Sequence, residues 1–362
     1  MTFAKPTTPY CCFPDSTKRS NFSSLSTKPS STNDMMQRQA TLASIPVLND
    51  DETLYSWCAM AHALNPGRSV LATSVALFGS PNAGRLHDFP SHLSALASRF
   101  QGVLPDSRRL ALRHTLVGFF LPLQTPSTAG AILSELCAGA MPSIKMRLGI
   151  TASRIGSYHP LKSCDSCIQS DRARTGVAYW HIEHQWPSVA VCSKHELPLV
   201  MTWHPITPVH RREWLLPGNT DVTSLIEMPV LDDGQLVRLL QLAEFSTHMA
   251  LSEPAAFDCT RLARTYQERL RTLGLASVRG NLRLKLLLEV VRSRYRGIDA
   301  VPGFEPLQAI SPDWPGLVGA LSRRVPRSGH PLKHLLMIAM LFDSWPEFLA
   351  AYSVTANPPP SS

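Results

Sequence analysis

Two short cysteine motifs constrain the fold of this chain more than any other feature. Cys164 and Cys167 are separated by two residues, and after an interval of 24 residues Cys192 and His195 repeat this spacing. Each motif places two soft ligands on one tight turn, and two such turns supply the four tetrahedral ligands that structural zinc prefers. Four ligands leave no open position for water, so we expect a zinc ion that stabilises the fold and no catalytic residues.

The histidines between the two motifs leave alternatives open. His181 or His184 is an alternative fourth ligand. His181 and Glu183 also form the His-x-Glu of zinc deaminases, but there a Pro-Cys-x-x-Cys follows, whereas here the Cys-x-x-Cys comes first. A zinc hydrolase needs an open metal position. The sequence contains no His-Glu-x-x-His helix, P-loop or Gly-x-Ser-x-Gly motif, which argues against a metalloprotease, an ATPase and a serine hydrolase.

The segment around these motifs differs from the rest of the chain. Helical periodicity fades, four of the seven tryptophans lie between Trp180 and Trp214, and apolar runs favour short strands. Between His159 and Glu196 there are four basic and four acidic residues, which makes a poor trap for phosphate. We therefore expect a small zinc ribbon whose tryptophans pack around the metal or against a protein.

The flanking regions show helical periodicity, which predicts a mainly α fold. Asn49 or Asp50 is a good cap for a first helix, whose apolar face is Leu54, Trp57, Cys58 and Ala61. A second helix ends at Gly79, and together the two have the outline of a helix-turn-helix. Further helices are predicted at 90–100, 106–118, 127–137, 144–148, 233–251, 258–273, 281–296, 314–323 and 331–352.

The excess positive charge lies in the C-terminal third. The chain has a formal net charge of +8, and Cys259 to His334 alone holds fourteen Lys or Arg against five Asp or Glu. This asymmetry favours contact with a polyanion or an acidic protein, although a solvated helical surface has the same appearance. The predicted helices here form a second helix-turn-helix outline, and the predicted contact residues are Arg261, Arg264, Arg271, Arg283, Lys285, Arg292, Arg294 and Arg296. His330 and His334 are interpreted as packing or capping residues.

These patterns predict helical domains on both sides of a zinc module. No run reaches the roughly 18 apolar residues of a membrane helix, and no secretory signal is evident, so we expect no membrane and a cytoplasmic location. The predicted divisions are a disordered tail (1–40), an N-terminal helical domain (41–157), the zinc module (158–205), a linker (206–232), a basic helical domain (233–353) and a second tail (354–362).

Three stretches resemble the TniQ/TnsD family, which contains the target-selection proteins of bacterial transposons. The first is DETLYSWCAMAHALN at 51–65, followed by ALFGS at 76–80. The second runs from Cys164 to Val200, where a knuckle, an Asp, a Tyr-Trp pair, a second Trp and the Cys-x-x-His knuckle come in the family's order. The third is HPLKHLLMIAMLF at 330–342, which is similar to the TnsD end of the family.

The resemblance implies a non-catalytic adaptor that selects a target and recruits the transposon's AAA+ ATPase. It assigns structural zinc to the four predicted ligands, and it implies a bacterial protein of the nucleoid. The target is a DNA site or a CRISPR effector complex, and a homodimer is also left open. Members that read a DNA site usually extend further beyond the third stretch, which leaves open a CRISPR-coupled or accessory role. The alternative is a stand-alone zinc-dependent DNA-binding regulator.

Overall fold

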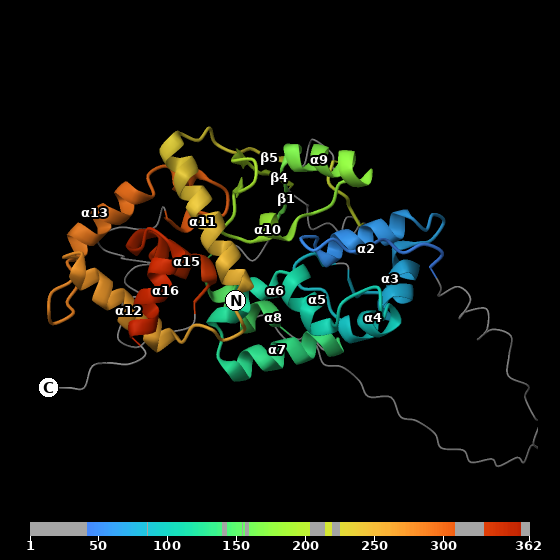
Figure 1. Ribbon diagram of the computed structural model, residues 1–362, viewed down its shortest axis with the longest axis horizontal. Helices are drawn as coiled ribbons and strands as arrows, with labels where there is room; N and C mark the ends of the chain where they lie inside the picture. The colour runs from blue at the N-terminus through green and yellow to red at the C-terminus, as the bar shows by residue number, and fades with distance from the viewer. Residues whose placement is uncertain are drawn as a thin grey trace, which may run out of the picture. The chain divides into compact units, whose positions relative to one another are not determined.

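The computed structural model is mainly helical, as the sequence predicts (Figure 1). It describes residues 42–84, 86–139, 143–153, 155, 159–202, 214–218, 225–307 and 329–355. Ala40–Ser362 is one compact unit, and one hydrophobic core extends from Leu54 to Tyr352. The tail at 1–40 and the helix at 314–323 lie outside the described residues, as do most of the linker at 206–232 and of the tail at 354–362.

Short helices make up the N-terminal part. Thr53, and not Asn49 or Asp50, caps the first of them, because the Thr53 hydroxyl accepts a hydrogen bond from the Ser56 amide at 3.1 Å. The predicted apolar face of this helix is fully buried. The elements are α2 (Leu54–Ala63), α3 (Val70–Phe78), α4 (Leu93–Arg99), α5 (Ser107–His114), α6 (Val117–Phe120), η1 (Leu121–Leu123), α7 (Pro126–Ala138), α8 (Ile144–Arg147) and η2 (Thr151–Ser153).

The single helix predicted over 106–118 is wrong, because Thr115 divides it. Thr115 is extended, with φ −135° and ψ 164°. Its hydroxyl donates to the carbonyl of Ala111 at 2.6 Å and accepts from the amide of Val117 at 3.2 Å. A local side-chain hydrogen bond thus competes with the helix ladder at this residue. The break separates α5 from α6 and brings the Leu116 amide to the carbonyl of Asp88.

The helix predicted over 331–352 is likewise two helices, α15 (Pro331–Leu341) and α16 (Trp345–Val354). Phe342 is extended, the Ser344 hydroxyl caps α16, and a proline follows at its start, so the first helix cannot continue. The two helices are bent by 95°. Among the described residues no single helix is long and apolar enough to cross a membrane. Only the combined length and composition of this bent pair reach the values of a membrane span.

The middle region contains short strands, as predicted, but it also contains a helix that the sequence analysis missed. Strands β1 (Leu161–Ser163), β4 (Val200–Thr202) and β5 (Leu225–Ile226) form an antiparallel sheet in the order β1-β4-β5, with Leu161 opposite Thr202. Strands β2 (Val191–Cys192) and β3 (Leu197–Pro198) form a separate hairpin. The unpredicted helix is α9 (Asp165–Thr175), and a single turn, α10 (Ile182–Gln185), precedes the hairpin.

A long helix joins the middle region to the C-terminal helices. This helix is α11 (Asp233–Leu251), which begins with a capping box between Asp232 and Gln235 and packs against α6, α15 and β2. Its contacts place the hairpin that carries Cys192 and His195 against the helical core. The remaining elements are α12 (Cys259–Thr272), α13 (Leu284–Arg294), η5 (Ile298–Ala300) and η6 (Glu305–Leu307), and α12 packs on α15 and α16.

Candidate metal centre and basic surface

The fold brings the four predicted metal ligands together. Cys164 is the N-cap residue of α9, and Cys167 lies in its first turn. Cys192 ends β2, and His195 lies in the turn that leads to β3. This turn is closed by a hydrogen bond from the Glu196 amide to the carbonyl of Cys192 at 2.8 Å, with Glu196 in the left-handed region at φ 54°. A helix start and a hairpin turn thus each present two ligands.

The distances between the ligand atoms match a tetrahedral zinc shell. All four atoms lie within 4.8 Å of one another. His195 Nδ1 is 3.5 Å from Cys164 Sγ, 3.3 Å from Cys167 Sγ and 3.6 Å from Cys192 Sγ, and the sulfurs of Cys167 and Cys192 are 3.7 Å apart. Zinc bond lengths place two sulfurs of a tetrahedral shell about 3.8 Å apart, and a sulfur and a nitrogen about 3.6 Å apart.

Burial and crowding disfavour three thiolates in this cluster unless a cation is present. The three cysteines are buried, with Cys192 fully inaccessible. The hydrogen bond between Cys167 and Cys192 raises the pKa of Cys167 far above that of an ordinary thiol and lowers the pKa of Cys192, and burial raises the pKa of Cys164. A bound divalent cation would stabilise all three as thiolates and would crosslink α9 to the β2–β3 turn. The donor set therefore fits structural zinc.

The two alternative ligands lie outside the cluster. His181 is held between carboxylates, with Nδ1 2.8 Å from Asp51 and Nε2 3.0 Å from Asp171. His184 is buried near Cys192, whose pKa is lowered by the hydrogen bond with Cys167 and also by His184, but it is not among the four residues whose ligand atoms lie within 4.8 Å of one another. With His195 as the fourth ligand, the tetrahedral shell has no open position for a water, which opposes a catalytic metal.

The contacts of His181 form a junction that sequence reasoning missed. We call Asp51, Asp171, Tyr179 and His181 the carboxylate–histidine junction. The Tyr179 hydroxyl donates to Asp51 at 2.8 Å, and the amide of Ile182 donates to the carbonyl of Asp51. Although burial acts in the opposite sense, the hydrogen bond from His181 lowers the pKa of Asp51 to about 2. Burial by itself would lower the pKa of His181, but the hydrogen bonds to Asp51 and Asp171 outweigh it and raise this pKa.

This junction connects the residues just before α2 to the region that carries the candidate metal ligands. Asp51 and His181 are 130 residues apart in the chain, so no local spacing pairs them. The acidic run at 50–52 and the histidine were each visible in the sequence. Only the fold, in which Glu52 and His181 form an isolated β-bridge, brings them together.

The predicted contact arginines fall into two groups. Arg261 and Arg294 are half-buried and form hydrogen bonds to other segments of the chain. Arg261 donates to the carbonyls of Tyr352 and Ser353 and lies 3.9 Å above the Tyr352 ring, while Arg294 donates to the carbonyl of Ala339 and to Gln241. The exposed group consists of Arg264, Arg271, Arg283, Lys285, Arg292 and Arg296.

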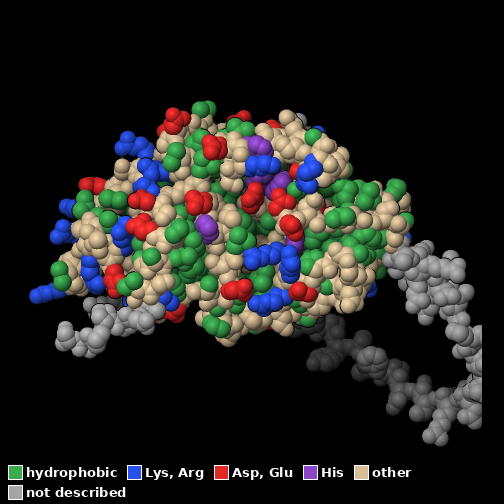
Figure 2. Space-filling view, viewed as in Figure 1, with side chains coloured by type: hydrophobic (Ala, Val, Ile, Leu, Met, Phe, Trp, Pro, Cys, Tyr) green, Lys and Arg blue, Asp and Glu red, His purple; other side chains and the backbone are tan. Residues whose placement is uncertain are grey.

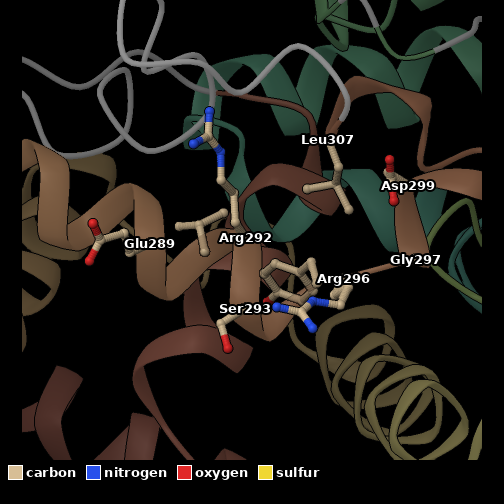
Figure 3. Close-up of a pocket in the computed structure, with 9 residues that line it drawn as sticks. Glu289, Arg292, Ser293, Arg296, Gly297, Asp299 and Leu307 are labelled. Carbon is tan, nitrogen blue, oxygen red and sulfur yellow. The ribbon is translucent and has the colours of Figure 1, made fainter.

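The exposed group lies on α12, on α13 and beside them. Figure 2 shows many Lys and Arg side chains over these two helices. Their connection is not a short turn, because Ala276 and Leu282 pair as an antiparallel bridge, and the predicted helix-turn-helix stays a prediction. Arg292 and Arg296 line a hollow of about 650 Å³ together with Glu289 and Asp299 (Figure 3). The surface is therefore basic overall but carries acidic groups at this hollow.

The two predicted histidines of α15 are packing and capping residues, as expected. The ring of His330 accepts a hydrogen bond from the Leu332 amide at 3.2 Å and so caps the helix. His334 is 1 % exposed, and its Nδ1 lies 3.1 Å from the Tyr266 hydroxyl.

Comparison with known proteins identifies the family. The sequence model of TniQ matches residues 43–199, and that of Tn7-like transposition protein D, TnsD, matches residues 242–360. The chain belongs to the TniQ/TnsD family of transposition proteins. It is similar to the transposon Tn7 transposition protein TnsD of Escherichia coli, with 23 % identity over 261 residues. The match covers 70 % of this chain and 49 % of that relative, so the chain spans about half of the relative's length.

The TniQ match and the TnsD match each contain one of the two candidate sites. The four metal ligands and the carboxylate–histidine junction lie inside the TniQ match, and the exposed arginines lie inside the TnsD match. The resemblance predicted from the three sequence stretches is thereby confirmed.

Proposed function

We propose that this TniQ/TnsD protein is a zinc-stabilised, non-catalytic adaptor that selects the target of DNA transposition and recruits the transposon's AAA+ ATPase. The observation that carries the proposal is the placement of a four-ligand Cys3His cluster and an exposed basic surface in one compact unit. The metal would hold the TniQ region in shape, and α12 and α13 would meet the phosphate backbone of the target. Such an adaptor would act in the bacterial cytoplasm, at the nucleoid.

Exposed guanidinium groups favour DNA as the target contact. Arginine binds phosphate through its planar fork of N–H donors, and each phosphate contact releases counterions. In the described part of the chain, no ion pair of 4.0 Å or less to an acidic residue is formed by Arg264, Arg271, Arg283, Lys285 or Arg296. A CRISPR effector complex offers the same phosphate chemistry through its nucleic acid, so the surface suits either target. The domain boundaries expected from the sequence are kept as part of this proposal.

A reconstitution with purified components tests the proposal. The full chain, the AAA+ ATPase of the same transposon and biotinylated target DNA are mixed, and retention of the ATPase on the DNA is measured. We expect retention only when the chain is present. Binding of DNA without retention of the ATPase would instead support the stand-alone regulator, and failure to bind either DNA or an effector complex would refute both functions.

A matched pair of variants assigns the DNA contact. Arg264→Gln with Arg271→Gln removes two exposed charges from α12, and Arg108→Gln with Arg172→Gln removes two from α5 and α9. We expect the first pair alone to reduce retention. Equal losses from both pairs would show that only the net charge matters, and would remove the proposed role of α12.

A further inference from the structure

A groove that the proposed function does not use lies between the metal-bearing region and the N-terminal helices. It consists of two adjoining hollows, of about 590 Å³ and about 570 Å³, which share Asp50, Asp51 and Glu183. The first is also lined by α5 and by the end of α11. Figure 2 shows acidic side chains over α10 and basic side chains over α5, facing each other across the centre of this view. The name charged groove is used below only for the first hollow, of about 590 Å³.

The floor of the charged groove is apolar. Ile182 and Trp186 are 9 % and 5 % exposed, and Ala250 is buried beside them. Leu251, at the end of α11, is 52 % exposed at the rim. A floor of this kind accepts an apolar side chain and gains from excluding water.

The two walls carry opposite charges that do not satisfy one another. Arg109 and Arg113 come from α5, while Asp50 and Glu183 come from the opposite wall. In the described part of the chain none of these four side chains forms an ion pair of 4.0 Å or less. Among the residues that the structure describes, Arg113 Nη1 is buried and has no hydrogen-bond partner, and Nη2 is 3.5 Å from the carbonyl of Leu251. A buried guanidinium N–H without an acceptor is costly, so an acceptor from a ligand is expected here.

This arrangement selects one class of ligand. A nucleic acid would meet the acidic wall, whose carboxylates repel phosphate. A wholly apolar helix would remove the four charges from water without partners. A peptide with an acidic side chain, an apolar side chain and a basic side chain satisfies both walls and the floor.

We propose that the charged groove binds an extended, mixed-charge peptide segment of a partner protein. Its carboxylate pairs with Arg113 and Arg109, its apolar side chain covers Trp186, and its basic side chain meets Asp50 and Glu183. The groove adjoins the carboxylate–histidine junction, because Asp51 lines both hollows and also binds His181. This inference does not depend on the proposed function, since no contact to DNA or to the ATPase enters it.

A display library of 12-residue peptides, selected on the zinc-loaded full chain, tests this proposal. Affinities of the enriched peptides are measured by fluorescence anisotropy. We expect enriched peptides to carry one acidic and one basic residue flanking an apolar one. Arg113→Gln and Arg109→Gln should each weaken binding by about tenfold or more, as expected for loss of one partner of a desolvated charge pair. Arg113→Glu should restore binding to peptides whose acidic residue is replaced by lysine.

The control is Arg108→Gln, which changes the same residue type on the same helix outside the groove lining and should leave binding unchanged. Thermal unfolding of each variant shows whether the fold is retained. If Arg113→Gln does not fold, Arg109→Gln alone tests the proposal, because Arg109 is exposed. Peptides that bind Arg109→Gln and Arg113→Gln as well as the parent chain would overturn the proposal. So would a concentration-dependent dimer, or binding of a DNA duplex, that these two variants abolish.

Discussion

The metal cluster and the basic surface of α12 and α13 differ in how their side chains are held. The cluster consists of four side chains from two turns, with three of them buried and all ligand atoms within 4.8 Å. The exposed cations are spread over two helices and their connection, and they face solvent. We expect a change at a ligand of the cluster to disturb the fold and a change at an exposed arginine to have little effect on stability. The first site should control folding and the second should control affinity.

The largest expected effect is loss of the metal. Cys192→Ser removes one of the four ligands, and structural zinc contributes a binding free energy of about 10 to 16 kcal/mol in small zinc domains. Because a folded domain is stable by only about 5 to 15 kcal/mol, we expect loss of both zinc and folded protein. Zinc content and circular dichroism of the purified chain measure the outcome. A variant without zinc that keeps its full thermal stability would contradict a structural metal.

A pair of arginines from one helix gives the next largest contrast. Arg261→Met removes hydrogen bonds to two carbonyls of α16, and we expect the chain to lose about 1 to 3 kcal/mol of stability. Arg264→Met, one turn away and exposed, should change stability by less than about 0.5 kcal/mol. Denaturant unfolding measures both. Equal losses of stability from the two changes would contradict the division of the arginines into a structural group and an exposed group.

The smallest expected effect concerns pH and the carboxylate–histidine junction. The pKa of His181 is raised above 6.5 in the fold, so the stability that it contributes is fully present below pH 6.5 and is lost as the pH rises through the folded pKa. We therefore expect the stability of the parent chain to fall between pH 6.5 and the alkaline range by more than that of His181→Gln. Identical pH profiles for the two proteins would show that the junction does not hold a charged histidine.

The proximity of the four candidate ligands was predictable because its information is local. Two ligand pairs at two-residue spacing determine two turns, and four soft ligands have few partners other than a metal. The unpredicted α9 begins directly after Cys164, so that Cys164 lies at the N-cap and Cys167 lies on the first turn. Polar residues such as Ser166 and Asp171 obscured the helical periodicity there.

Breaks and long-range contacts were not predictable from the sequence. Thr115 ends α5 through its own hydroxyl, and a threonine within a helical pattern does not reveal this. Lys162 also looks like a surface residue of a strand. In the fold it is 3 % exposed, it donates to the carbonyls of Trp186 and Val189, and its burial lowers its pKa to about 7. These outcomes depend on the packing of distant segments, which the residue pattern does not contain.

The salt dependence of DNA binding tests most directly the claim that the exposed cations of α12 and α13 meet the target. The parent chain is compared with a variant in which Arg264, Arg271, Arg283 and Lys285 are glutamine. Each lost phosphate contact should reduce the slope of log affinity against log salt by about 0.9, so we expect a reduction of about two to four with zinc content unchanged. An unchanged slope and affinity in the zinc-loaded variant would contradict this account.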